Sequence, residues 1–277
     1  MPPTLTPGFL DAPSGRLFAL ELAPADGGHG QALILPPFGE EMNRTRRTLF
    51  ALAERLAERG LAVTLPDLFG TGDSEGTFEQ ATWSGWLADS TWLLDRSAAR
   101  AGGPVSLVAM RTGVLLAAGA LAARPEACGG LICVQPVTDG KRYLDQVLRT
   151  RVAAAMSRGQ AATRASFWAQ WSEGQTVEVG GYAISPRLAE GLAACRLAEM
   201  APPADLPVVW ATLVGGGAHD TSEGSGPPAP AWPDSWARPC LRDVRLASPQ
   251  IWALAEVPDT VPVGRALADH VELAAAA

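Results

Sequence analysis

The sequence predicts an α/β fold with a mostly parallel, doubly wound sheet and a helical lid insertion. Short continuous apolar runs bounded by turn residues, as at 32–35 and 105–109, are typical of strands buried on both faces of a sheet. Segments with apolar residues at helical spacing lie between these runs. Such strand–helix alternation implies right-handed crossovers and therefore parallel strands. The alternation is interrupted after residue 140, and this interruption indicates the insertion.

The individual elements follow from local signals in chain order. Residues 17–22 are expected to form an edge or hairpin strand. In the segment 45–59, Leu49, Leu52 and Leu56 repeat at helical spacing before Gly60 ends the helix. A further helix, 83–100, ends at a Gly-Gly pair. We expect the remaining strands at 62–66, 130–134, 206–214 and 244–246, and the remaining core helices at 112–123 and 263–273.

Residues 141–203 form the predicted lid over the ends of the strands. Three segments in this stretch have helical character, and a polar turn at Glu173-Gly174-Gln175 separates two of them. The lid divides the core into residues 1–140 and residues 204–277. Residues 215–238 are rich in Gly, Pro and Ser and are expected to form a long loop, and a loop of this length in a compact domain is usually functional or disordered.

Composition excludes several classes of function. The net charge of −7 disfavours binding to nucleic acid and to anionic membranes, because both need a basic face. No apolar run approaches the roughly 20 residues that span a bilayer, and the first residues lack a signal-peptide pattern. The four cysteines and three histidines are scattered without the spacing of a zinc site. We therefore expect a cytoplasmic protein without metal, cofactor, nucleic-acid partner or membrane span.

The Gly-rich stretch 67–76 directly follows a predicted strand. Its alternating glycines permit a tight turn at the carboxyl edge of the sheet. The stretch resembles the post-strand turn of α/β-hydrolases, D-x-x-G-x-G-x-S. A phosphate-binding loop is the weaker interpretation, because no Lys follows the glycines and because Asp73 and Glu75 would repel an anion.

The strand–turn–helix at 105–113 is where α/β-hydrolases carry G-x-S-x-G, with the nucleophile at a strained elbow. The flanking small residues are present here as Ala109 and Gly113, so the tight turn is feasible. The central residue is Arg111. Arginine stays protonated and offers no lone pair, so it is not a nucleophile.

The stretch 36–43 corresponds to the loop that supplies half of the oxyanion hole in hydrolases. Gly39 would allow the backbone to approach a ligand closely. Two consecutive carboxylates, Glu40 and Glu41, would oppose an oxyanion but would suit a neighbouring cation, and Arg111 is the natural candidate. The expected ligand-binding residues are Phe38, Gly39, Glu40, Glu41, Asn43, Met110 and Arg111.

The other members of a catalytic triad are poorly represented. Asp220 stands about where the acid often lies, although an exposed Asp in a Gly-rich loop explains it equally well. His219 lies in the wrong place for the base. The base should follow the last strand, near 248–252, and that segment contains no His. We therefore treat Asp220 as a weak candidate for the acid.

Several stretches together resemble one family, the exosortase A system-associated hydrolases of the second type. The resemblance rests on 36–43 with Arg46-Arg47, on 67–76, on Ala81-Thr82-Trp83, on the Arg-centred elbow, and on 135–141 and 177–182. It covers about residues 30–214. It implies an α/β-hydrolase fold in a bacterial cytoplasmic protein encoded near exopolysaccharide and protein-sorting machinery. It implies no substrate.

The sequence leaves three functions open. In the first, the chain is a catalytically degenerate binding or accessory protein, whose Arg111 either pairs with Glu40 or Glu41 as a plug or binds a small anionic, acyl or sugar ligand. In the second, it is an active ester or thioester hydrolase or acyltransferase with non-standard residues. The candidate substitute nucleophiles are Ser74, Ser106, Thr112 and Cys133. In the third, a partner protein or a second copy binds an aromatic surface formed by Trp168, Trp171, Trp232 and Trp236.

Overall fold

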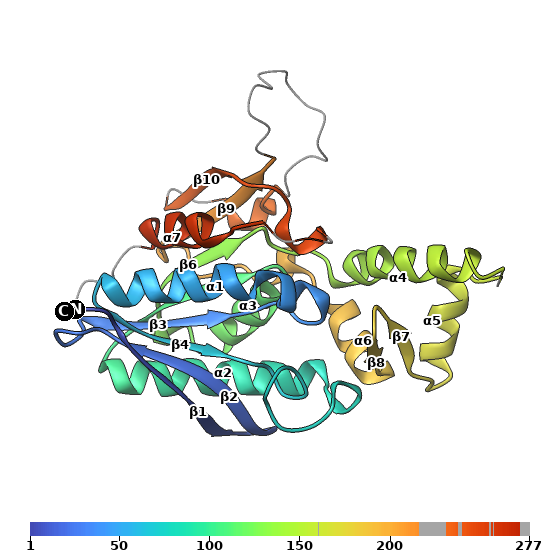
Figure 1. Cartoon of the computed structure of the whole chain (residues 1–277), viewed down its shortest axis with the longest axis horizontal. Helices are drawn as coiled ribbons and strands as arrows, with labels where there is room; N and C mark the ends of the chain where they lie inside the picture. Colours follow the sequence, from blue (N-terminus) through green and yellow to red (C-terminus); the bar gives the residue numbers. More distant parts are fainter. Residues whose placement is uncertain (160, 216–230, 238–239, 255, 257, 272–277) are drawn as a thin grey trace.

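An eight-stranded sheet forms the centre of the molecule (Figure 1). The computed structural model describes residues 1–159, 161–215, 231–237, 240–254, 256 and 258–271. The strand order is β1-β2-β4-β3-β5-β6-β9-β10. The strands are β1 (Thr4–Ala12), β2 (Gly15–Ala23), β3 (Gly30–Leu35), β4 (Leu61–Pro66), β5 (Val105–Met110), β6 (Cys128–Val134), β9 (Val208–Val214) and β10 (Leu241–Ala247).

The sheet is parallel except around β2, which pairs antiparallel with both β1 and β4. All neighbouring pairs from β4 to β10 are parallel. The predicted mostly parallel sheet is confirmed, and every predicted strand is present within a few residues of its expected bounds. Strand β1 was not predicted. Its residues are mostly exposed and it contains Pro7 and Gly8, so it lacks the apolar pattern of a core strand.

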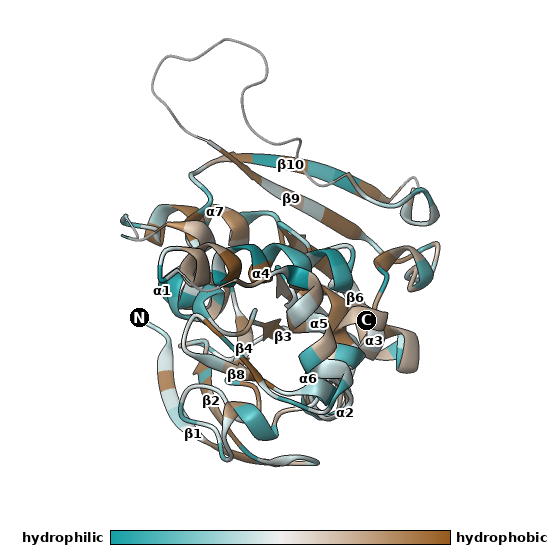
Figure 2. Cartoon of the chain, turned by 90° about the vertical axis from the view of Figure 1, so that its right-hand side faces the viewer, coloured by the Kyte–Doolittle hydropathy of each residue, from teal (hydrophilic) through white to brown (hydrophobic). Residues whose placement is uncertain are grey.

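Helices cover both faces of the sheet, as a doubly wound fold requires. The helices α1 (Glu40–Glu58) and α7 (Val261–Asp269) pack together on one face, and α2 (Trp83–Ala101) and α3 (Gly113–Ala123) pack together on the other. Alternate residues of β3 serve the two cores: Leu33 and Leu35 point toward α2 and α3, whereas Ala32 and Ile34 point toward α1 and α7. Figure 2 shows hydrophilic stretches on α1 and along the edge strand β10.

Helix α1 begins at Glu40, five residues before the predicted start. Gly39 is its N-cap residue with φ 64° and ψ −145°, a conformation that glycine adopts without strain. The first turn then holds two carboxylates, Glu40 and Glu41, and negative charge is favourable at a helix N-terminus. The earlier start matters for the site because it places Glu41 on a rigid helix rather than on a loop.

The inserted segment lies at one end of the molecule (Figure 1). It contains α4 (Gly140–Met156), α5 (Arg164–Ser172) and α6 (Pro186–Ala194), as its helical pattern predicts. It also contains a two-stranded sheet, β7 (Val177–Val179) and β8 (Tyr182–Ile184), which was not predicted. Gly180 and Gly181 join these strands with φ 59° and 85°, the geometry of a tight hairpin turn. The exact limits of the lid, 141–203, stay a prediction.

Short 3-10 helices complete the fold. They are η1 (Phe78–Gln80), η2 (Pro125–Ala127), η3 (Leu197–Glu199), η4 (Asp234–Trp236) and η5 (Ile251–Ala253). The last of these follows β10 and lies against α1. None of the helices in the described part of the chain combines the length and apolar character that crossing a membrane requires.

Candidate functional site

The turn between β5 and α3 has the backbone of a nucleophile elbow. Arg111 has φ 54°, in the left-handed region that costs a non-glycine residue about 1 kcal/mol or more. Its N–H donates to the carbonyl of Val134 at 3.0 Å, and its carbonyl accepts from Val114 and Val137, both at 3.2 Å. A Cβ on Gly113 would clash with the carbonyl oxygen of Leu35, so close packing requires glycine there. Hydrogen bonds from β6 and α3 therefore hold the strained residue in place.

The side chain of Arg111 forms a two-pronged ion pair with Glu41. Its Nε donates to Glu41 Oε2 at 3.1 Å and its Nη2 donates to Glu41 Oε1 at 2.9 Å. The third nitrogen, Nη1, donates to the carbonyl of Gln135 at 3.3 Å. The two side chains are only 10% and 14% exposed. Every guanidinium nitrogen of Arg111 thus has an acceptor from the protein itself.

Trp252 covers the face of the same guanidinium. The Arg111 Cζ atom lies 4.7 Å from the centre of the indole ring, within cation–π range. Trp252 is in η5, directly after β10, which is where the sequence analysis sought the catalytic base. Arg44 on α1 donates to the Trp252 carbonyl at 3.1 Å and fixes this segment to the helix. An indole therefore lies over the elbow residue in the segment expected to carry an imidazole.

Gln135 is the second non-glycine residue with a positive φ, 44°. Its N–H donates to the Ala211 carbonyl at 2.7 Å, and its side-chain oxygen accepts from Leu213 N at 2.9 Å. Because its own carbonyl accepts from Arg111, this buried residue joins β6, β9 and the elbow. Sequence reasoning did not identify it, and its position directly after a buried strand was the available signal.

Aromatic rings occupy the space beside the ion pair. Phe38 lies at the centre of this group, with Trp86 at 5.1 Å and Tyr143 at 5.8 Å between ring centres. Tyr143 is buried, and desolvation raises the pKa of its hydroxyl well above the usual value; the Glu41 carboxylate raises it further and the Arg111 cation opposes the rise. Tyr143 is therefore a neutral packing residue at ordinary pH.

The two adjacent carboxylates diverge. Glu40 is half exposed and lies 3.6 Å from Arg44, one helical turn along α1, whereas Glu41 points to the elbow. Asn43 donates to the Tyr182 hydroxyl at 2.7 Å and so connects α1 to the lid hairpin. Of the residues expected to bind a ligand, the structure brings Glu41 and Arg111 together, packs Phe38 beside them, buries Met110 in β5, and places Glu40 and Asn43 on the outward side.

The substitute nucleophiles are buried or already engaged. The hydroxyl of Ser74 accepts from Phe18 N and donates to the Asp67 carbonyl, both at 2.8 Å. Ser106 and Thr112 are buried, and so is Cys133, where desolvation raises the pKa of the thiol. A raised thiol pKa lowers the fraction of reactive thiolate. Asp220 and His219 lie outside the described residues.

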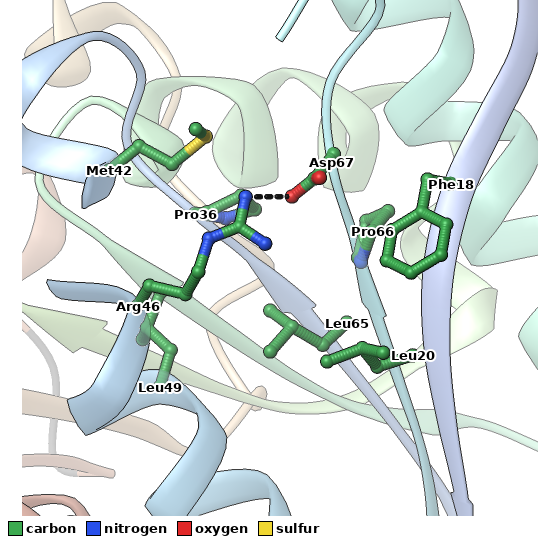
Figure 3. A pocket seen from close by; sticks show the side chains of 9 residues that line it. All are labelled: Phe18, Leu20, Pro36, Met42, Arg46, Leu49, Leu65, Pro66 and Asp67. Carbon is green, nitrogen blue, oxygen red and sulfur yellow. Dashed lines mark hydrogen bonds and ion pairs between the residues drawn. The ribbon is translucent and has the colours of Figure 1, made fainter. Parts of the chain in front are cut away.

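The Gly-rich loop is held by its own aspartate. Arg46 donates to Asp67 Oδ1 at 2.7 Å (Figure 3). The other carboxylate oxygen of Asp67, Oδ2, accepts from Asp73 N at 3.0 Å. A Cβ on Gly72 would clash with the Asp67 carboxylate. The small recess beside this pair, about 20 Å³, has room for about one water molecule and is not lined by Arg111. Asp67 is therefore a structural residue of the loop.

No group of three or more His, Cys, Asp or Glu side chains within the described ranges could hold a metal ion. The four cysteines carry no disulfide, with Cys128 and Cys133 buried and the other two partly exposed. The functional groups that face the elbow are therefore the guanidinium of Arg111, the carboxylate of Glu41 and the indole of Trp252.

Comparison with known proteins places this geometry in a family context. Residues 30–177 match the model of a hydrolase family whose description is "Serine aminopeptidase, S33". No curated protein sequence matches the chain.

Solved structures resemble the chain over nearly its whole length. Est1E from Butyrivibrio proteoclasticus, bound to ferulic acid, has a TM-score of 0.66 at 17% identity over 95% of this chain and 96% of that chain. A thioesterase domain from the curacin biosynthetic pathway has a TM-score of 0.55 at 17% identity, with coverage of 97% and 99%. An alpha-beta serine hydrolase homologue from Coxiella burnetii has a TM-score of 0.55 at 14% identity, with coverage of 96% and 97%. At such identities the likeness shows the fold, which is that of α/β hydrolases, and not the chemistry.

Proposed function

We propose, from the premise that this chain belongs to the serine aminopeptidase S33 family of α/β hydrolases, that it is a catalytically degenerate member acting as a binding or accessory protein. The observation that carries the proposal is that the elbow is closed: the side chain at the nucleophile position is fully engaged by other parts of the protein. Arg111 occupies the nucleophile position at φ 54° and is locked by Glu41 at 2.9 and 3.1 Å.

Two groups that acyl transfer requires, a nucleophile and a general base, are not provided by the residues described at this elbow. A nucleophile needs a lone pair, and the guanidinium is permanently protonated. A general base must accept the proton of the nucleophile, and the indole of Trp252 is a donor only. The positive charge of Arg111 could in principle stabilise an oxyanion, but the Glu41 carboxylate neutralises it.

The contacts favour an internal plug over an anion site. A ligand carboxylate or phosphate that bound Arg111 would have to displace Glu41, and it would leave that carboxylate unpaired in a mostly buried position. Trp252 would also have to leave the face of the guanidinium. We infer that the accessory role uses another surface of the molecule.

The sequence resemblance supports a cellular system in which the accessory protein would act. Residues 30–214 resemble exosortase A system-associated hydrolases, which supports a place in a bacterial exopolysaccharide or exosortase-linked system in the cytoplasm. The alternative, an active ester or thioester hydrolase or acyltransferase, has less support because its substitute nucleophiles are buried or hydrogen-bonded.

The test is hydrolysis of p-nitrophenyl butyrate and of an acyl-coenzyme A thioester by the purified protein. Arg111→Ala and Arg111→Ser are measured beside it, with Arg187→Ala as a control for loss of a surface arginine. We expect no turnover above a buffer blank for any of these proteins, because Arg111→Ser restores a hydroxyl but no base. Turnover by the wild type that Arg111→Ala abolishes and Arg187→Ala leaves intact would overturn the proposal.

A further inference from the structure

The part of the lid that forms α4 and α5 carries a charge opposite to that of the rest of the molecule. Residues 140–172 contain six basic residues and one acidic residue, Asp145. The remainder of the chain contains sixteen basic and twenty-eight acidic residues. Helices α4 and α5 in this segment lie at the far end of the long axis of the molecule in Figure 1 and face the viewer in Figure 2. The acidic protein therefore presents a basic end.

An open recess lies between these two helices at that end. Four of its lining residues, Arg149, Val152, Ala153 and Met156, follow α4 at the i, i+3, i+4, i+7 spacing of one helix face. Ala162, Thr163 and Arg164 at the start of α5 line the other side. The recess has a volume of about 340 Å³. Its floor is apolar and an arginine lies on each side.

None of the residues that the structure describes occupies the recess. Met156 is 66% exposed, an unusual state for a large apolar side chain. Arg149, Arg158 and Arg164 are exposed and form no ion pair with any residue that the structure describes. By contrast, Arg142 at the other end of α4 lies 3.8 Å from Asp139. Within the described ranges, the two arginines that line the recess, Arg149 and Arg164, thus have no carboxylate partner.

We propose that this α4–α5 recess is the docking site for an acidic amphipathic helical segment of a partner protein. A partner helix would place apolar side chains on the floor formed by Val152, Ala153 and Met156, in the helix-in-groove mode. Its flanking carboxylates would pair with Arg149 and Arg164, because a guanidinium fork binds carboxylates through two hydrogen bonds. The proposal depends on the lid alone and holds whether or not the elbow is catalytic.

Two other occupants fit the geometry less well. A second copy docking its acidic body on this end would form a head-to-tail contact, which builds a ring or an open filament and not the two-fold dimer that is commonest among homo-oligomers. An anionic bilayer favours apolar groups that project into it, whereas Val152, Ala153 and Ala162 line a recess that receives a side chain. Both occupants are distinguishable outcomes of the test.

Three labelled probe peptides of equal length test the site by fluorescence anisotropy on the chain of 277 residues. The first is a helix-forming peptide of Glu, Ala and Leu with its leucines on one face. The second replaces Glu by Lys, and the third replaces Leu by Ser. We expect the first to bind, the second not to bind, and the third to bind at least tenfold more weakly. Binding of the first should weaken when salt is raised, since the contacts are partly ionic.

Protein variants locate the binding. The double variant Arg149→Glu/Arg164→Glu should weaken binding of the first peptide at least tenfold, and Val152→Ser should weaken it severalfold without any charge change. Arg187→Glu, an exposed arginine on α6, is the matched control and should leave binding unchanged. Circular dichroism melting confirms that each variant folds.

Three results would overturn the proposal. The first is failure of the first peptide to bind, or equal binding by the wild type and the double variant. The second is that the protein does not bind the peptide but sediments with vesicles of phosphatidylcholine and phosphatidylglycerol and loses this property in the double variant. The second result would assign the recess to an anionic lipid surface. The third is an apparent mass of the protein alone that increases with protein concentration in light scattering, and that no longer increases in the double variant. This result would assign the recess to a second copy of the chain.

Discussion

Replacement of Glu41 by alanine is the most informative perturbation of the elbow. It leaves the Arg111 cation in place but removes its carboxylate. Removal of one partner from a fully buried ion pair costs about 3–5 kcal/mol. Here the side chains are 10% and 14% exposed, and Arg111 keeps the Gln135 carbonyl and the Trp252 ring. We therefore expect Glu41→Ala to lower the free energy of unfolding by about 2–3 kcal/mol.

The neighbouring Glu40 supplies a matched control for this measurement. It lies in the same first turn of α1 and has the same helix-dipole interaction, but its partner is the partly exposed Arg44 at 3.6 Å. Glu40→Ala should cost less than about 1 kcal/mol, as for a surface pair. Both variants are compared by urea denaturation followed by circular dichroism at neutral pH.

A double-mutant cycle isolates the interaction between Glu41 and Arg111. Arg111→Ala leaves the Glu41 carboxylate unpaired, whereas the double variant removes both charges. The double variant should cost less than the sum of the single variants by about 2 kcal/mol. Additive costs, or a Glu41→Ala effect no larger than that of Glu40→Ala, would refute the closed elbow.

Three further predictions follow from other features of the structure. Arg111→Gly should be more stable than Arg111→Ala by about 1 kcal/mol in urea denaturation, because glycine adopts the φ of 54° without strain; equal stability would contradict the strain. Gly113→Ala should cost about 2–3 kcal/mol, because the new methyl group meets the Leu35 carbonyl, and an unchanged urea midpoint would show that the elbow has room. Burial raises the pKa of Asp89, whose Oδ1 accepts from Ser14 N at 2.9 Å while Oδ2 has no hydrogen-bond partner in the described residues. The folded state therefore retains the proton more strongly than the unfolded state, and the wild type loses stability as pH rises through the raised pKa. Asn at position 89 does not titrate, so Asp89→Asn should raise the free energy of unfolding by about 1 kcal/mol at neutral pH and leave it unchanged near the ordinary Asp pKa of about 3.9. A stability gain that is the same at both pH values would contradict the presence of a charged, buried carboxylate.

The core of the fold could be predicted because its strands are continuous apolar runs. All six residues of β5 are buried, and a run such as Val105-Ser106-Leu107-Val108 that follows Gly102-Gly103-Pro104 has few alternatives to a central strand. Strand β1 could not be predicted in this way, since its stability comes from pairing with β2 rather than from an apolar pattern. The lid hairpin β7–β8 was missed because three-residue strands carry too few residues to show a period.

The sequence was enough to predict which residues lie near the elbow, but not which carboxylate pairs with Arg111. The sequence placed Arg111 at the elbow and two carboxylates near it, but the choice between Glu40 and Glu41 depends on where α1 begins. The cover provided by Trp252 could not be foreseen, because about half of the chain separates it from Arg111 and the strand order β5-β6-β9-β10 brings them together. The weak acid candidate Asp220 falls outside the described residues and stays a prediction.

Under the proposal made above, Arg111 closes the elbow and leaves the protein without an acylating nucleophile. Intact-mass spectrometry after incubation with an alkyl fluorophosphonate tests it directly, because this reagent forms a stable adduct with an activated hydroxyl. We expect an unchanged mass for the wild type and for Glu41→Ala. One equivalent of adduct on the folded wild type, and none on the heat-unfolded protein, would show an activated nucleophile and contradict the closure of the elbow by Arg111.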